Sequence, residues 1–242
     1  MNKIAAENCI KSFKENGYSI LKNSIDLDSI FQSQAYASDF LKCKNSSESI
    51  IKAMENLESS NINFFYEFCK RMGEVNSVTK IALQDNFMNI VSDVLKTPNV
   101  HLTDRAVFYN KLSVKRLQYD WHQENSYFPN AKEVITLWYP WLHPVNEENG
   151  TMVMAKGAHR LKYAAERIPV QNGLTQMKIA EELIKDFEKE NCDLELGDAV
   201  LFSFNSPHKT GHNSTKIPRS TMVVRYTDMI GKYSNGWDAV SY

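Results

Sequence analysis

Residues 196–204 read LGDAVLFSF, a glycine turn followed by an unbroken apolar run. The Gly197-Asp198 pair predicts the turn, and Ala199–Phe204 is typical of a buried strand. Four other short runs are rich in β-branched and aromatic residues, which favour strands. They are Val107–Tyr109, Val134–Trp138, Thr151–Met154 and Thr221–Tyr226. Many short strands separated by turns predict a sandwich or barrel and not a parallel α/β sheet.

The first hundred residues carry a different pattern, with apolar side chains at helical spacing. Lys3–Glu15 is the first such segment, and Asn16-Gly17 ends it before a short predicted strand, Tyr18–Leu21. Further helices are predicted near residues 28–43, 47–58, 61–73 and 84–96. One more helix is predicted among the strands, from Thr175 to Glu190. Its stripe of apolar residues, from Met177 to Phe187, is interpreted as core packing.

A chain of 242 residues is expected to form a single domain. Residues 1–100 are predicted to form a mainly helical layer. Residues 101–230 form a barrel-like core with a helical insertion near residues 163–190, and residues 231–242 form a tail. The overall class is therefore α+β.

The composition favours a small-molecule substrate. The chain has 28 basic and 29 acidic residues and a net charge of −1, whereas binding to nucleic acid or an anionic membrane needs a basic surface. No stretch approaches the roughly 20 apolar residues of a membrane span. The four cysteines include no C-x-x-C pair, and we interpret them as free thiols in a reducing compartment. These features predict a soluble, cytoplasmic protein.

The segment from Tyr119 to Glu124 carries the strongest chemical signal. His122 and Glu124 stand two residues apart, so on a strand both side chains point to the same face. His208 follows the predicted strand Ala199–Phe204. Two imidazoles and one carboxylate on one face of an octahedron leave three positions open, as in non-haem iron(II) oxygenases.

A His and a Glu two residues apart are common by chance, so the surroundings of His208 matter. Arg219 lies eleven residues after His208 and begins the next predicted strand region. The planar fork of an arginine matches a carboxylate with two parallel hydrogen bonds, which a lysine cannot do. Arg219 is therefore placed to hold a dicarboxylate near the metal.

Several ordered blocks resemble the phytanoyl-CoA hydroxylase-like family of iron(II)- and 2-oxoglutarate-dependent oxygenases (phytanoyl-CoA dioxygenases). The resemblance covers roughly residues 105–226. Its blocks are Trp121–Glu124, Tyr127–Pro129, the strand ending in Trp138, Glu148–Val153, Gly157–Arg160, Leu196–Phe202, the run from His208 to Thr215, and Arg219.

This resemblance implies a double-stranded β-helix, or jelly roll, with iron at its open end. It implies that His122 and His208 bind the iron together with Glu124. Arg219 and Thr210 would hold the distal carboxylate of the cosubstrate 2-oxoglutarate, and Trp138 would wall its pocket. The implied reaction uses O2 to hydroxylate or otherwise oxidise a C–H bond of a small metabolite and releases succinate and CO2.

Glu124 departs from the aspartate that is usual in this family. Three readings remain open: a working ligand, an altered metal preference, or a lapsed site. Halogenating relatives replace this carboxylate with a small residue, so its presence favours hydroxylation or desaturation. Two rival functions also remain, a zinc hydrolase using the same three ligands and a binding protein on the same fold. The exact substrate and the oligomeric state are left open.

Several other residues are candidates for lesser roles at the site. Arg225 is the reserve candidate for the cosubstrate clamp, because it lies six residues beyond Arg219 on the same predicted face. Asn125 is a candidate substrate contact. Structural or surface roles are expected for four histidines, and three aromatic residues are possible pocket walls. These are His101, His143, His159 and His212, and Tyr127, Tyr139 and Trp141. Residues 163–190 and the tail with Trp237 and Tyr242 are lid candidates.

Overall fold

Six helices fill the N-terminal part of the computed structural model, which describes residues 3–111, 118–128, 131–170 and 174–228. They are α1 (Lys3–Asn16), α2 (Leu27–Leu41), α3 (Ser47–Ser60), α4 (Ile62–Glu74), α5 (Asn76–Ala82) and α6 (Asp85–Leu95). Five of them match the predicted segments. Helix α5 was not predicted, because seven residues give too few turns for a periodic pattern to stand out.

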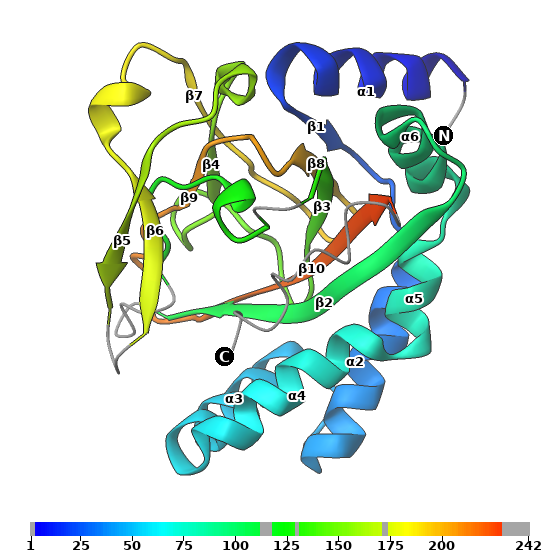
Figure 1. The fold of residues 1–242 in the computed structure, drawn as a ribbon. Coiled ribbons are helices and arrows are strands. Elements are labelled where there is room, and N and C mark those ends of the chain that lie inside the picture. The colour runs from blue at the N-terminus through cyan, green and yellow to red at the C-terminus, as the bar shows by residue number, and fades with distance from the viewer. Residues whose placement is uncertain (1–2, 112–117, 129–130, 171–173, 229–242) are drawn as a thin grey trace.

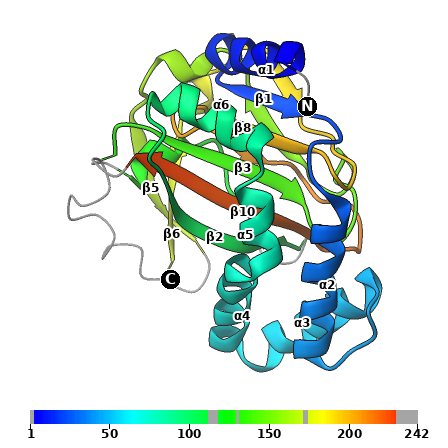
Figure 2. The ribbon, with the colours of Figure 1, turned by 90° about the vertical axis from the view of Figure 1, so that its right-hand side faces the viewer.

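A five-stranded antiparallel sheet forms the larger wall of the core, in the order β1-β8-β3-β10-β2. Its strands are β1 (Tyr18–Leu21), β8 (Ala199–Ser203), β3 (Val134–Pro140), β10 (Arg219–Asp228) and β2 (Val100–Asn110). Each overlaps a strand predicted from sequence, although β2 begins seven residues before the predicted run Val107–Tyr109. Figure 2 shows helices α4, α5 and α6 lying across one face of this sheet.

Side chains alternate between the two faces of β10, and this alternation separates the helical core from the barrel interior. Met222, Val224 and Tyr226 are buried in one apolar cluster with residues of the helices. Val223 belongs to a second cluster, together with Trp138 of β3. Arg219 and Arg225 stand an even number of residues from Val223, so they share the interior face.

A smaller sheet, β7 (Lys189–Asn191), β4 (Met152–Ala155) and β9 (His208–Thr210), closes the core opposite that interior face. Met152 and Met154 of β4 pack in the same cluster as Trp138. Two facing antiparallel sheets confirm the predicted α+β jelly roll. Within the described residues no helix is long and apolar enough to cross a bilayer.

The predicted helix from Thr175 to Glu190 is wrong. The structure has strand β6 (Thr175–Ile179), a 3-10 turn (Glu181–Leu183) and strand β7 in its place, and β6 pairs with β5 (Ala165–Pro169). Figure 1 shows the β5–β6 hairpin on the side of the barrel away from the helices. The backbone N–H of Ile179 donates to Trp121 O at 2.7 Å. Tertiary strand pairing therefore overrode a local pattern that matched helical spacing.

The apolar stripe of that segment packs as a core only in part, because Ile184 is buried and Phe187 half-buried, whereas Leu183 is 48 % exposed. Ile179 and Ile184 are fully buried, and they cluster with Trp121 and Ala158. This cluster attaches the insertion to the segment that carries His122. The insertion is therefore built as a hairpin and turn over the metal-ligand segment.

Helix α4 contacts the sheet through Gly73. A Cβ added there would lie 2.2 Å from the carbonyl carbon and oxygen of Arg105 on β2. We expect Gly73→Ala to lower the free energy of unfolding by about 3 kcal/mol because the helix must move off the sheet. For a chain of this size the fall in Tm is roughly 6–12 °C. Thermal denaturation measures it, with exposed Lys70→Ala on the same helix as the control. An unchanged or raised Tm in Gly73→Ala would contradict this packing.

Candidate metal centre

His122 and His208 are placed side by side by a pair of backbone hydrogen bonds. The His122 N–H donates to His208 O, and the His208 N–H donates to His122 O, both at 3.0 Å. The two rings are 4.2 Å apart between centroids. His208 is the first residue of β9, where it pairs with Met154 of β4. The barrel wall thus fixes the separation of the two imidazoles.

Glu124 reaches the same point from an irregular segment. His122 and Glu124 do not share a regular strand, because His122 forms only an isolated bridge and Glu124 begins a 3-10 turn that ends at Ser126. Gln123 between them is extended, with φ −115° and ψ 139°. One extended residue is enough to keep His122 and Glu124 on the same side, so the conclusion drawn from spacing survives the loss of the strand.

The three side chains form a compact and buried set of donor atoms. Oε1 of Glu124 lies 3.9 Å from Nε2 of His122 and 3.8 Å from Nε2 of His208. Their exposed fractions are 4 %, 7 % and 6 % for His122, Glu124 and His208. Ligand atoms of all three lie within 4.8 Å of one another. They are the only such group of three or more possible ligands among the described residues.

Each imidazole is oriented by a backbone carbonyl. Nδ1 of His122 is 2.7 Å from Asp120 O, and Nδ1 of His208 is 2.9 Å from Ser206 O. A carbonyl accepts only, so Nδ1 carries the proton and the lone pair of Nε2 faces Glu124. Such outer contacts are typical of histidines that bind metals.

The protonation states also suit a metal ion. Burial lowers the pKa of His208 to about 3 and also lowers the pKa of His122. Burial alone would raise the pKa of Glu124, but Arg225 and the two histidines hold it below its usual value. Two neutral imidazoles and one carboxylate are the forms that ligate a divalent cation. The donor set therefore fits iron(II).

Arg219 lies in the barrel interior, and no carboxylate among the described residues neutralises its charge. It is 5 % exposed, and its Nη1 donates to Gly150 O. Its Nε has no hydrogen-bond partner, and no described carboxylate forms an ion pair with it. Burial lowers its pKa to about 10. A buried guanidinium in this state is costly unless an anion pairs with it, so Arg219 fits one carboxylate of a dicarboxylic cosubstrate.

Trp138 and Thr210, the other two predicted cosubstrate residues, lie on strands that face the same interior. Cζ of Arg219 is 5.6 Å from the centroid of the Trp138 ring. Thr210 stands two residues after His208 on β9, and its Oγ1 accepts from the Tyr119 N–H at 3.2 Å. The backbone also crosses closely here, since a Cβ on Gly150 would lie 2.7 Å from Gly211 O. This close crossing brings Thr210, which precedes Gly211, near Gly150, whose carbonyl accepts from Arg219.

Arg225, the reserve candidate for the clamp, is already engaged by carboxylates. Its Nη2 donates to both oxygens of Glu124, at 3.2 and 3.1 Å, and its Nη1 pairs with Asp104 of β2. Arg225 therefore lies next to the metal centre and already has two carboxylate partners. Among the described residues Arg219 has no such partner, so it is the arginine left to pair with an anion. Sequence reasoning placed Arg225 on the correct face but assigned it no role toward Glu124.

Three residues of the site were missed from sequence. Asp104 pairs with Arg225, and Asn110 is fully buried opposite Arg219 in the β2–β10 register. Asn110 at the end of the apolar run Ala106–Tyr109 was the available signal, whereas Asp104 stands among other polar residues of β2. The Gln123 side chain donates to Leu161 O and Asn205 O and accepts from the Tyr163 N–H. Gln123 thereby anchors the turn between the two ligands.

The remaining aromatic candidates separate into two groups. Tyr139 and Trp141 belong to the helix-side core, where the Trp141 Nε1–H donates to Ser33 Oγ at 2.8 Å. They do not wall the barrel interior. The Tyr127 ring lies 6.1 Å from the His122 ring, and its hydroxyl accepts from the Met177 N–H at 2.9 Å. Tyr127 therefore links the β5–β6 hairpin to the metal centre.

The polar candidates outside the triad have structural contacts. Asn125 donates to Asn205 Oδ1 at 2.7 Å, and the His143 ring contacts the carbonyls of Pro144 and Pro218. His159 packs beside Gly17 at the end of α1, and His212 is exposed. His101 lies on β2. Trp237 and Tyr242, proposed as part of a lid, lie outside the described residues.

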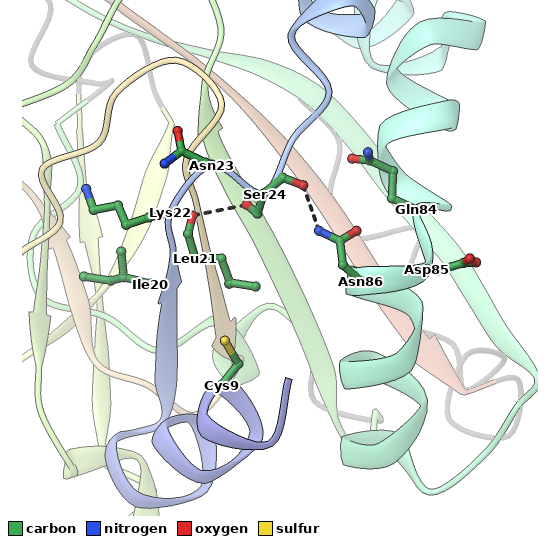
Figure 3. Close-up of a pocket in the computed structure, with 9 residues that line it drawn as sticks. All are labelled: Cys9, Ile20, Leu21, Lys22, Asn23, Ser24, Gln84, Asp85 and Asn86. Carbon is green, nitrogen blue, oxygen red and sulfur yellow. Dashed lines mark hydrogen bonds between the residues drawn. The ribbon is translucent and has the colours of Figure 1, made fainter. Parts of the chain in front are cut away.

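A pocket of about 600 Å³ lies away from the metal centre, on the helical side of the large sheet between α1, β1 and α6 (Figure 3). It holds none of the three ligands. Its lining is held by backbone contacts, such as Asn86 Nδ2 donating to Ser24 O at 2.7 Å. The lining residues are Cys9, Ile20, Leu21, Lys22, Asn23, Ser24, Gln84, Asp85 and Asn86. We assign it no part in the chemistry of the metal centre.

Comparison with known proteins gives one family and several solved structures of similar fold. The family model described as phytanoyl-CoA dioxygenase (PhyH) matches residues 13–221. No curated protein matches the chain.

Three solved structures illustrate the fold. The epimerase SnoN, in complex with Fe3+, alpha ketoglutarate and nogalamycin RO, superimposes with a TM-score of 0.66 at 16 % identity, covering 94 % of this chain and 85 % of SnoN. AviO1 from Streptomyces viridochromogenes Tue57 gives 0.65 at 13 % identity, covering 96 % and 98 %. EvdO2 from Micromonospora carbonacea var. aurantiaca, complexed with 2-oxoglutarate, gives 0.62 at 16 % identity, covering 94 % and 91 %.

Proposed function

This chain belongs to the phytanoyl-CoA dioxygenase family of iron- and 2-oxoglutarate-dependent oxygenases, and we propose that it oxidises a C–H bond of a small metabolite at a centre held by His122, Glu124 and His208. Hydroxylation is the proposed outcome, with succinate and CO2 released from the cosubstrate. One observation carries the proposal. A buried triad with neutral imidazoles shares the barrel interior with Arg219, a buried guanidinium that has no carboxylate partner among the described residues.

Each residue has a defined task in this proposal. Iron(II) with 2-oxoglutarate and O2 supplies the oxidising power for C–H cleavage. Nε2 of each histidine and a carboxylate oxygen of Glu124 would hold the metal, a ligand set typical of iron(II) sites that also bind a cosubstrate and O2. Arg219 pairs with the far carboxylate of the cosubstrate, and Thr210 donates its hydroxyl proton to the same group. Trp138 covers the side of this pocket next to Arg219.

Glu124 is proposed to be a working ligand despite its extra methylene. Its carboxylate already points at both imidazole nitrogens, and its pKa is held low, so it is charged when a metal arrives. Neither feature is expected at a lapsed site, where a buried carboxylate beside two histidines would only cost stability.

The substrate is proposed to be small and partly apolar. Tyr119 and Tyr127 stand beside the His122 ring, with ring centroids 5.4 and 6.1 Å from it. Aromatic side chains of this kind line sites for small organic ligands. The nogalamycin RO bound to SnoN is a small molecule held on the same fold, which supports this class of substrate.

The deciding experiment adds 2-oxoglutarate to the iron(II)-loaded protein without oxygen. We expect the weak visible charge-transfer band of chelated 2-oxoglutarate in the wild type, and its loss in Glu124→Ala because the carboxylate ligand is gone. Admission of O2 should then yield succinate. A zinc-loaded protein that hydrolyses esters equally well without oxygen would support the zinc hydrolase. No band at saturating iron and 2-oxoglutarate would contradict the proposed function.

A further inference from the structure

Arg225 contacts the oxygen atoms of Glu124 in a particular way. Its Nη2 lies 3.2 Å from Oε1 and 3.1 Å from Oε2, and all these groups are buried. Oε1 is also the atom that lies within 4 Å of both imidazole nitrogens. Oε1 of Glu124 therefore lies near both imidazoles, while the guanidinium contacts both carboxylate oxygens.

The guanidinium itself is held rigidly. Its Nη1 is paired with Asp104, which lies on the neighbouring strand β2. Its Cζ lies 5.6 Å from the centroid of the Phe108 ring and 5.7 Å from that of the Phe128 ring. Arg225 thus lies in contact with two aromatic rings and two carboxylates, and its planar fork has little freedom to turn away from Glu124.

The length of Glu124 makes this anchoring consequential. A glutamate has one more rotatable bond than an aspartate, so it can swing both oxygens toward a metal. The two histidines and one oxygen of Glu124 would leave the remaining positions of a bound metal to the 2-oxo acid and O2. A Glu124 that bound through both oxygens would compete with the 2-oxo acid for those positions.

We propose that Arg225 is a positioning residue that restrains Glu124, so that this carboxylate would bind a metal through one oxygen and would not compete with 2-oxoglutarate, with Asp104 orienting the guanidinium. This inference rests on the proposed function. It concerns how the carboxylate binds and not whether it binds. Contacts of this kind, one step removed from a metal, typically change metal affinity or activity by about 10–100-fold when they are removed.

The test measures two affinities separately, that of the protein for iron(II) and that of the iron-loaded protein for 2-oxoglutarate, through the anaerobic charge-transfer band. In Arg225→Met we expect iron(II) binding to remain within about 10-fold of wild type. The affinity for 2-oxoglutarate is expected to fall by roughly 10–100-fold, because the cosubstrate must displace a carboxylate oxygen. Arg105→Met is the matched control, since that arginine donates to Thr79 at 2.7 Å on the helix side of β2.

Arg225→Lys guards against a folding failure, because it keeps the charge between Asp104 and Glu124. A single ammonium cannot form the planar fork, so a loss of 2-oxoglutarate affinity of about 10-fold is still expected. A double-mutant cycle with Glu124→Asp supplies the diagnostic signature. The shorter carboxylate withdraws from the guanidinium, so Arg225→Met should cost much less in that background than in the wild type.

The outcomes separate cleanly. No band in the wild type would refute the proposed function. A wild-type band with unchanged 2-oxoglutarate affinity in Arg225→Met and Arg225→Lys would overturn the positioning role alone. Additive effects in the cycle would overturn it too, because they would mean that Arg225 acts independently of Glu124. Parallel losses of iron and 2-oxoglutarate affinity in both variants would show a general structural role and would also overturn it.

Discussion

Arg219→Met is expected to weaken 2-oxoglutarate binding strongly while the protein keeps its iron(II) site. Truncating one partner of a buried charge pair costs about 2–5 kcal/mol. The affinity of the iron-loaded protein for 2-oxoglutarate should therefore fall by roughly 30-fold to several thousand-fold. Iron(II) affinity should change little, because Arg219 donates to Gly150 and lies over Trp138 without an ion pair to Glu124.

The same substitution should not destabilise the protein without ligands. Wild-type Arg219 buries a charge whose Nε has no hydrogen-bond partner, and removing such a charge relieves a desolvation cost. We expect the Tm of ligand-free Arg219→Met to equal or exceed that of the wild type. The anaerobic charge-transfer titration and thermal denaturation measure the two effects, with Arg105→Met as the matched arginine control. Retained 2-oxoglutarate affinity in Arg219→Met would contradict the assignment of the clamp.

His208→Ala is expected to remove the stabilisation that a divalent metal gives to the wild type. A ligand present at 100 times its Kd raises the free energy of unfolding by about 2.7 kcal/mol. For a chain of this length that corresponds to a rise in Tm of roughly 5–11 °C. Manganese(II), which is stable in air, can serve as the probe. Removing one of three ligands should reduce the shift to within error.

The matched control for His208→Ala is His212→Ala. His212 lies four residues further along the chain and is exposed, so its removal should leave the metal-induced shift intact. Adding a chelator to wild type should reverse the shift. A full manganese(II) shift in His208→Ala would mean that the metal binds elsewhere, and the triad would lose its role.

Part of the fold followed from local sequence. The apolar alternation of β10 and the unbroken run of β8 placed the main sheet correctly, because burial on one or both faces leaves a period-two or continuous apolar signature. The segment from Thr175 to Glu190 failed for the converse reason. Its apolar residues match helical spacing, but its backbone groups bond to β5 and to Trp121, which lie far from it in sequence.

The candidate site divides in the same way. The triad and Arg219 were predicted from the sequence. The ligand types, their spacing and the position of the arginine eleven residues after His208 are properties of the chain itself. His122 and Glu124 do not lie on a regular strand, yet the expected alignment held because a single extended residue, Gln123, suffices to align two side chains. The sequence ranked Arg219 ahead of Arg225 for the clamp, but it did not reveal that Arg225 contacts Glu124.

The sequence by itself determined the fold class, the metal-binding residue types and the family to which the chain belongs. These depend on residue identity, order and periodicity, which are local quantities. Only the tertiary structure decided which arginine meets a carboxylate: Asp104 and Glu124 reach Arg225 from segments 121 and 101 residues away, while Arg219 is buried without a carboxylate partner in the described part of the chain. Charge pairing depends on distance in space, and strand pairing in the barrel sets that distance.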